Sequence, residues 1–213
     1  MLTIKVFQVN PIMENCYVVS DETNEACIID CGCCNESEWN EINTYIISNN
    51  LKPVHLLCTH CHFDHIWGCG FVSRDYNLKA EGSMTDFELY NGLNAQFNMF
   101  GLPSPTTPTL PPLKDIMASG PITFGNHHFD VIATPGHTQG GICLYCKAEA
   151  TLFSGDTLFQ GSIGRTDLPG GNYNTIIKSV AEKLLTLPED TKVYTGHGPS
   201  TTIDYEKKFN PYV

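Results

Sequence analysis

The apolar positions of this chain gather in short runs that are rich in β-branched and aromatic residues and are bounded by turn-forming residues. Runs of this kind are typical of strands that are buried on one or both faces of a sheet. We predict strands at residues 3–9, 16–20, 26–30, 54–58, 129–134, 142–146, 151–154 and 192–195. Strands therefore dominate the pattern.

Two segments between these runs have the period of a helix that buries one face. One begins near Asn35, where Glu38 is placed for a capping box, and the other covers about 174–187 and ends before Pro188. The apolar faces consist of Trp39, Ile42 and Ile46 in the first helix and of Ile177, Val180, Leu184 and Leu187 in the second. Strands and helices in this order predict an α/β fold in which helices cover the sheets.

Residues 86–120 interrupt the pattern because they are rich in glycine and proline, with "LPSPTTPTLPPL" at their centre. We expect a long lid or rim loop here and not a domain boundary. Since no internal repeat or linker divides the chain, residues 1–213 are predicted to form a single domain.

The charge balance argues against two classes of partner. Lys and Arg total 12 against 23 Asp and Glu, a formal net charge of -11, so the basic footprint of a nucleic-acid or anionic-membrane binder is missing. The stretch "MLTIKVFQVN" has no apolar core long enough for a signal peptide, and no later run approaches a membrane span. We therefore expect a cytoplasmic protein with no nucleic-acid or membrane partner; the oligomeric state is not predicted.

Ten cysteines would suggest disulfides in a small secreted chain, but without an export signal we expect reduced thiols. Two groups could form a second metal or redox site: Cys31, Cys33 and Cys34, or Cys143 and Cys146. The simpler alternative for Cys143 and Cys146 is that both are core residues of the predicted strand 142–146, and the usual burial of cysteine favours it.

Histidine and aspartate residues follow the ends of several predicted strands. These positions are His60 after 54–58, His137 after 129–134, Asp156 after 151–154 and His197 after 192–195. A glycine, at 136, 155 and 196, directly precedes the last three, where a tight turn is needed. Because the ends of neighbouring strands meet along one rim of a sheet, we expect these side chains to converge.

The stretch "THCHFDH" (59–65) concentrates this chemistry further. If it leaves a strand and enters a helix, His60 and His62 point the same way and Cys61 points opposite. Asp64 and His65 can then face a second point nearby, so the stretch favours two metals over one. The histidines that lack this context, interpreted as ordinary, are His55, His127 and His128.

In this order along the chain, "THCHFDH", "TPGHTQGG", "SGDTLF" and "TGHGPST" resemble the motifs of the metallo-β-lactamase superfamily. Asp30 in "IIDCG" matches the family's buried supporting aspartate, so the likeness runs from Asp30 to His197. The resemblance implies a four-layer αβ/βα sandwich with the active site at the edge between the two sheets.

The resemblance also implies a ligand set for two divalent metal ions, with zinc favoured and iron or manganese as alternatives. One metal is assigned to His60, His62 and His137, the second to Asp64, His65 and His197, and Asp156 bridges both. The implied reaction is hydrolysis by a hydroxide that bridges the metals, and Asp64 is the residue that could take a proton during turnover.

Within the superfamily, β-lactamases typically use a cysteine in the second metal site, whereas this chain has His65 there. In this respect the chain resembles short single-domain glyoxalase II-like hydrolases. The implied substrate is a small-molecule thioester, S-lactoylglutathione or a similar acyl-thiol. Arg165 lies where these enzymes have a basic residue that binds a glutathione carboxylate, although pairing with Asp167 is an equal alternative. The glutathione-binding helical extension is not expected, and Gly198 and Pro199 stand where the longer enzymes have a substrate-contacting tyrosine.

Two rival hypotheses remain. Persulfide dioxygenase-like enzymes share these motifs but bind one iron, here through His60, His137 and Asp156, so the metal count discriminates. A non-enzymatic zinc module is disfavoured because structural zinc sites are closed and four-coordinate. Lactone or phosphodiester hydrolysis at the same site is a further possibility.

Overall fold

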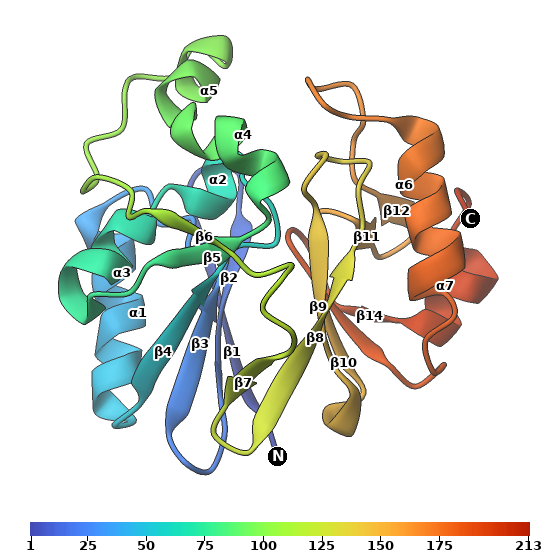
Figure 1. Cartoon of the computed structure of the whole chain (residues 1–213), viewed down its shortest axis with the longest axis horizontal. Helices are drawn as coiled ribbons and strands as arrows, with labels where there is room; N and C mark the ends of the chain where they lie inside the picture. Colours follow the sequence, from blue (N-terminus) through green and yellow to red (C-terminus); the bar gives the residue numbers. More distant parts are fainter.

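A computed structural model describes residues 1–213. Two six-stranded sheets lie face to face, and helices cover the outer face of each (Figure 1). The N-terminal part of the chain builds one sheet and its helices, and the C-terminal part builds the other. This arrangement confirms the predicted four-layer αβ/βα sandwich.

The first sheet is antiparallel between its first three strands and parallel from the third strand onward. Its order is β1 (Thr3–Val9), β2 (Glu14–Ser20), β3 (Glu25–Ile29), β4 (Lys52–Leu57), β5 (Ala80–Gly82) and β6 (Leu113–Asp115). Its helical segments are α1 (Glu36–Ser48), α2 (Phe63–Ile66), α3 (Cys69–Tyr76), η1 (Met84–Asp86), α4 (Phe87–Asn91) and α5 (Leu93–Met99).

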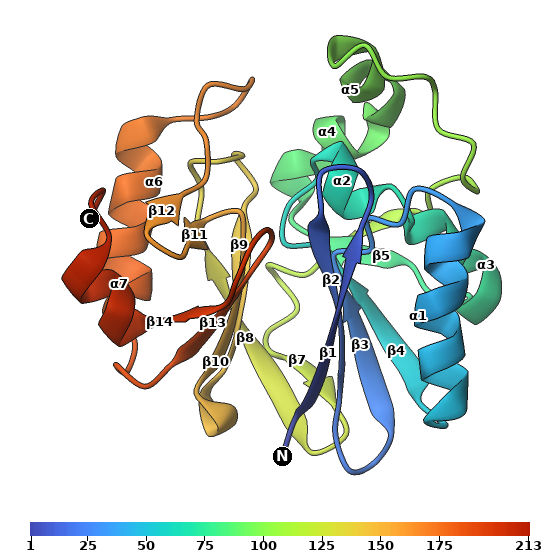
Figure 2. The ribbon, with the colours of Figure 1, turned by 180° about the vertical axis from the view of Figure 1, so that it is seen from behind.

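The second sheet faces the first, with its helices on the far side (Figure 2). Its order is β14 (Thr201–Thr202), β13 (Lys192–Thr195), β10 (Thr151–Gly155), β9 (Ile142–Cys146), β8 (His127–Ala133) and β7 (Ile122–Phe124). Its remaining elements are η2 (Lys147–Glu149), a hairpin of β11 (Leu158–Phe159) and β12 (Ser162–Ile163), α6 (Tyr173–Ser179), η3 (Val180–Leu184) and α7 (Ile203–Phe209).

Each sheet buries both faces, which is why its central strands are continuously apolar. In β2, Cys16 and Val18 belong to the core beneath α1 and α3, whereas Tyr17 and Val19 belong to the core between the sheets. A third core lies between the second sheet and α6, η3 and α7. Successive side chains of one strand therefore pack into two different cores, one on each face of the sheet.

The strand predictions are confirmed, with ends that shift by at most two residues. Around the first helix, Asn35 Oδ1 accepts a hydrogen bond from the Glu38 amide as expected. The Glu38 carboxylate, however, accepts from the amides of Cys34 and Asn10, so the capping box is only half formed. The second helix changes from α-helical to π-helical at Val180.

The expectation of one long loop over 86–120 is corrected by the structure. This segment contains α4, α5 and the edge strand β6. The segment packs against the first core through the buried side chains of Tyr90, Leu93 and Phe97. The many glycine and proline residues around them hid this apolar pattern in the sequence. Burial of these three side chains stabilises short helices that their sequence alone would not.

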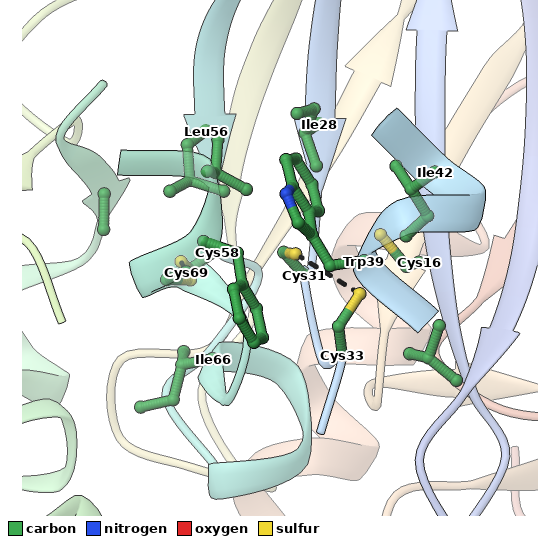
Figure 3. Packing of buried hydrophobic residues seen from close by; sticks show 14 of the residues in the cluster. Cys16, Ile28, Cys31, Cys33, Trp39, Ile42, Leu56, Cys58, Ile66 and Cys69 are labelled. Atoms are coloured by element: carbon green, nitrogen blue, oxygen red, sulfur yellow. Dashed lines mark hydrogen bonds between the residues drawn. The ribbon is translucent and has the colours of Figure 1, made fainter. Parts of the chain in front are cut away.

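The cysteines are predominantly core residues, and all ten are free. Cys143 packs in the core under α6 and Cys146 in the core between the sheets, so the two thiols lie on opposite faces of β9 and form no common site. Figure 3 shows Cys31 and Cys33 beside Trp39, with their sulfur atoms 3.8 Å apart. The interpretation of Cys143 and Cys146 as core residues is confirmed.

No helix of the structure combines the length and apolar character needed to cross a membrane.

Replacing Cys146 by alanine should lower the free energy of unfolding by roughly 1–2 kcal/mol, because a buried sulfur is removed from the core. The bound metal content should stay unchanged. Urea unfolding and metal analysis of Cys146→Ala and Cys143→Ala check this. A metal ion lost from both variants would instead show that the two thiols share a site.

Candidate metal centre

The predicted metal-binding side chains meet at one edge of the sandwich, between the two sheets. His60 follows β4, His137 follows β8, and Asp156 and His197 follow β10 and β13. His62, Asp64 and His65 come from the loop after β4 and from α2. The pattern predicted convergence along one rim of a single sheet, whereas strand ends from both sheets supply the site.

His60, His62 and His137 form the first group, in which each side chain offers a nitrogen within 4.8 Å of the others. His62 Nδ1 lies 2.8 Å from His137 Nε2. His137 Nδ1 is 2.7 Å from the Arg165 carbonyl oxygen, which can only accept, so Nδ1 carries the proton. The lone pair of Nε2 is therefore free for a cation.

Asp64, His65 and His197 form the second group. Asp64 Oδ2 lies 3.1 Å from His197 Nε2 and 3.4 Å from His65 Nε2. The Nδ1 atoms of both histidines are hydrogen-bonded on the side away from the centre. His65 Nδ1 lies 3.0 Å from Asp30 Oδ2, and His197 Nδ1 lies 3.2 Å from the Ile12 carbonyl oxygen. In both rings Nε2 is therefore the nitrogen directed inward, as it is in His60 and His137, whereas His62 presents Nδ1.

Asp156 lies between the two groups. Its Oδ2 is 3.5 Å from His137 Nε2, and its Oδ1 is 3.4 Å from His65 Nε2. Although burial opposes ionisation, His65 and the neighbouring histidines hold the pKa of Asp156 below its usual value. An ionised carboxylate that reaches both groups has the position of a bridging ligand.

The donor set fits divalent cations. Three buried atoms of the centre have no hydrogen-bond partner: His60 Nε2, His65 Nε2 and Asp156 Oδ1. Each such atom costs on the order of 1–3 kcal/mol when it stays unpaired. Metal ions held by the two groups would satisfy these atoms, since His60 belongs to the first group, His65 to the second, and Asp156 lies between the two.

The charge state of the first group also suits metal binding. Burial, together with the neighbouring histidines His65 and His137, lowers the pKa of His60 well below its ordinary value. Burial and His137 likewise lower the pKa of His62 to about 4. Both rings are therefore neutral at physiological pH, the form in which imidazole binds a metal.

Asp30 is hydrogen-bonded to His65 and to the start of the ligand loop. Its Oδ1 accepts from the Thr59 amide at 2.7 Å, and its Oδ2 accepts from the Thr59 hydroxyl at 2.6 Å and from His65. The backbone of Asp30 has a φ of 52°, a left-handed conformation unusual for aspartate. This backbone conformation places the Asp30 carboxylate where it orients His65 and Thr59, the first residue of the ligand loop.

Asp86, which the sequence reasoning missed, joins the two principal ligand loops. Its carboxylate accepts from the Cys61 amide at 3.2 Å, from the Thr138 hydroxyl at 2.7 Å and from the Gly140 amide at 2.6 Å. Thr138 and Gly140 belong to the His137 loop. No local signal marks this role, since the partners lie 25 to 54 residues away along the chain.

Gln96 of α5 is a second missed residue. Its side-chain oxygen accepts from the Phe63 amide, and its amide nitrogen donates to the carbonyls of Cys61 and Leu89. The segment that was expected to be a loop is therefore hydrogen-bonded to the backbone of the ligand loop. Because Cys61 and Phe63 flank His62, Gln96 fixes the backbone on both sides of a predicted ligand.

Glu14, also missed, is fully buried behind the second group. Its Oε1 lies 3.9 Å from His65 Nδ1, and neither carboxylate oxygen has a hydrogen-bond partner. Burial raises the pKa of Glu14 well above its usual value. The next residue, Asn15, donates to the carbonyls of Thr195 and Gly198, which fastens the start of β2 to the His197 loop.

In this structure the backbone of Arg165, and not its side chain, contacts a residue of the metal centre. Its carbonyl orients His137, whereas its exposed guanidinium forms two hydrogen bonds with Asp167 at 2.7 and 2.8 Å. The structure thus shows the pairing that the sequence offered as one alternative. The guanidinium also borders the cavity described below, so substrate contact stays a prediction.

Cys61 is directed away from the centre, into the core of the first sheet, as alternation predicted. The histidines interpreted as ordinary also lie outside the centre. His55 pairs with Glu81 and His127 with Asp21, and His128 is exposed.

A cavity of about 640 Å³ opens in front of the centre. His62, Asp64, His137, Asp156 and His197 line it on the metal side. The remaining lining is apolar apart from Ser162 and Arg165, and consists of Ile12, Phe63, Phe100, Leu102, Phe159, Ile163 and Leu168.

Asp86→Ala should weaken metal binding by about 10- to 100-fold, the usual effect of losing a group that orients ligand loops. Competition with a chromophoric chelator measures the change. Asp130→Ala, which removes a half-exposed carboxylate outside the centre, is the matched control. Equal metal affinity in the two variants would show that Asp86 does not position the loops.

His197→Ala should reduce the bound metal from two ions to one per chain, because the first group stays intact. Elemental analysis of purified protein gives the count, with His128→Ala as a control for loss of an exposed histidine. A single iron in the unmodified protein would instead favour the mononuclear arrangement through His60, His137 and Asp156.

Known proteins resemble this chain in sequence along nearly their whole length. "Probable metallo-hydrolase YqgX" of Bacillus subtilis is 38% identical over 96% of this chain and 94% of its own. "Hydroxyacylglutathione hydrolase GloC" of Haemophilus influenzae is 35% identical over 100% of this chain and 98% of its own.

Solved structures agree. BLEG-1 B3 metallo-β-lactamase superposes with a TM-score of 0.87 at 36% identity, covering 99% of both chains. TTHA1623 in a di-iron-bound form superposes with a TM-score of 0.85 at 33% identity, over 98% of this chain and 100% of that one. The model of the metallo-beta-lactamase superfamily matches residues 9–197, which include every side chain of the centre. The chain therefore belongs to the metallo-β-lactamase superfamily and is a metallo-hydrolase of that family.

Proposed function

We propose that the protein is a binuclear metal-dependent thioesterase of the glyoxalase II type, acting on S-lactoylglutathione or a similar acyl-thiol. The observation that carries the proposal is the pair of ligand groups in contact with Asp156. The second group contains His65 and no cysteine, the arrangement that resembles glyoxalase II. The 35% identity to a protein named hydroxyacylglutathione hydrolase supports the same assignment.

The cavity offers no protein nucleophile. No cysteine lines it, and its one serine, Ser162, bonds to a backbone carbonyl and not to a base. Two divalent cations, zinc by preference and iron or manganese as alternatives, would supply an acidified water and would polarise the substrate carbonyl. Hydrolysis without a covalent enzyme intermediate follows from this set of groups.

The side chains have separate tasks in this scheme. Asp64 lies at the cavity and contacts His197, so it can hold a proton while the carbonyl is attacked. Asp30 keeps His65 in one tautomer, and the Arg165 carbonyl does the same for His137. A thiolate leaves with little protonation, which suits a cavity that has no separate general acid.

A glutathione carboxylate would meet Arg165, the only cationic side chain that lines the cavity. To bind it, the guanidinium would have to exchange its hydrogen bonds with Asp167 for bonds to the substrate. Because that pair is exposed, the exchange has a low free-energy cost.

Purified protein loaded with zinc or with iron should hydrolyse S-lactoylglutathione, and Asp64→Ala should lower kcat/KM by at least about 100-fold through loss of a ligand and a proton acceptor. Release of free thiol measures the reaction. Asp130→Ala, a half-exposed change outside both ligand groups and the cavity, is the control and should retain thioester cleavage.

Benzylpenicillin and glutathione persulfide belong in the same assay as alternative substrates. No thioester cleavage in any metal form would end the thioesterase proposal. Cleavage of the lactam would then point to the activity named for BLEG-1. Oxygen consumption with the persulfide would point to the mononuclear iron alternative.

A further inference from the structure

A second, smaller cavity of about 170 Å³ adjoins the cavity in front of the metal centre. We call it the side pocket. It lies between α4, α5 and residues 168–169, and it shares His62, Phe100 and Leu168 with the larger cavity. Figure 1 shows α4 and α5 above the first sheet, at the same end of the sandwich as the loop that joins β8 to β9. A group bound at the metals can therefore extend past His62 into the side pocket.

The side pocket is apolar. Its walls are formed by Leu89, Ala95, Met99, Phe100, Leu168 and Pro169. Gln96 also lines it, but the oxygen and nitrogen of its amide are already engaged with the backbone of Phe63, Cys61 and Leu89. Apart from His62, the lining thus offers little for a polar ligand to bind, and burial of apolar surface is the interaction available.

The mouth of the side pocket exposes large apolar side chains. Met99 is 58% exposed and Phe100 is 40% exposed, and both line the pocket. Apolar side chains gathered and exposed at a cavity typically mark a ligand-binding surface. The only charged residue of the lining is Glu88, which repels a negatively charged ligand.

We infer that the side pocket binds the acyl chain of the substrate, and that the preferred substrate is a thioester with an unbranched apolar acyl group longer than lactoyl. This inference rests on the proposed thioesterase function. Glu88 in the side pocket would repel a thiol carrier that contains carboxylates. Arg165 in the larger cavity can bind such a carrier. The scissile carbonyl then lies at the metals, with the acyl chain toward α5 and the carrier toward Arg165.

The experiment compares thioesters of one neutral thiol, N-acetylcysteamine, with acetyl, butyryl, hexanoyl and octanoyl groups. In metal-loaded wild-type protein, kcat/KM should rise at least tenfold from acetyl to octanoyl, since each buried methylene adds up to roughly fourfold. Ala95→Trp fills the side pocket and should remove this preference, so that acetyl and octanoyl thioesters are cleaved with similar kcat/KM. Ala95→Leu, a smaller change at the same position, should lower kcat/KM for the octanoyl thioester and leave the shorter acyl groups less affected.

Asn98→Trp is the matched control. It introduces the same bulk at an exposed position of α5 that does not line the side pocket, so it should keep the octanoyl preference. Thermal melting of all three variants establishes that they are folded. Equal kcat/KM for acetyl and octanoyl in the wild type, or an octanoyl preference that survives Ala95→Trp, would overturn the inference and leave the thioesterase proposal intact.

A binding measurement separates this inference from the proposed function. If no thioester is cleaved, the thioesterase proposal fails, but octanoate and acetate can still be titrated into metal-loaded protein by calorimetry. Octanoate should bind at least tenfold more tightly than acetate, and Ala95→Trp should abolish the difference. Equal affinity for the two acids in the wild type would show that the side pocket binds no acyl chain.

Discussion

The structure depends on a constraint of charge and desolvation at the edge between the two sheets. Four histidines and Asp64 are buried there almost completely, Asp156 lies between them, and several ligand atoms of these side chains have no hydrogen-bond partner within the protein. Such a group is unfavourable without cations, because its buried nitrogen and oxygen atoms lose water without gaining a partner. Bound divalent metals convert the same arrangement into a stabilising one. The fold and the metals are therefore energetically coupled.

The ligands reach this edge because the loops that carry them are tied together. Asp30 ties the end of β3 to the loop after β4, and Asp86 ties that loop to the one after β8. Asn15 connects the start of β2 to the loop after β13. The ties span both sheets, so a change in packing between the sheets is transmitted to the ligand geometry.

The segment at 86–120 connects the metal centre to the walls of the adjoining cavity. Gln96 bonds to the backbone on either side of His62, and Phe100 and Leu102 line the cavity in front of the metals. One short helical insertion thus both supports a predicted ligand and shapes the apolar walls. Substrate selectivity in this chain is accordingly expected to depend on α4 and α5 more than on the metal ligands, which the chemistry of hydrolysis constrains.

The four-layer sandwich was implied by the resemblance of the motifs to the metallo-β-lactamase superfamily. The sequence by itself determined the main strands and the side chains that converge at the edge between the sheets. It could do so because buried strands and ligand motifs are written in local periodicity and spacing, as in "THCHFDH". Only the tertiary structure decided the roles of Asp86, Gln96 and Glu14, whose partners are distant in the chain, and the helical nature of 86–120. Long-range hydrogen bonds and burial fix these features, and neither leaves a pattern in neighbouring residues.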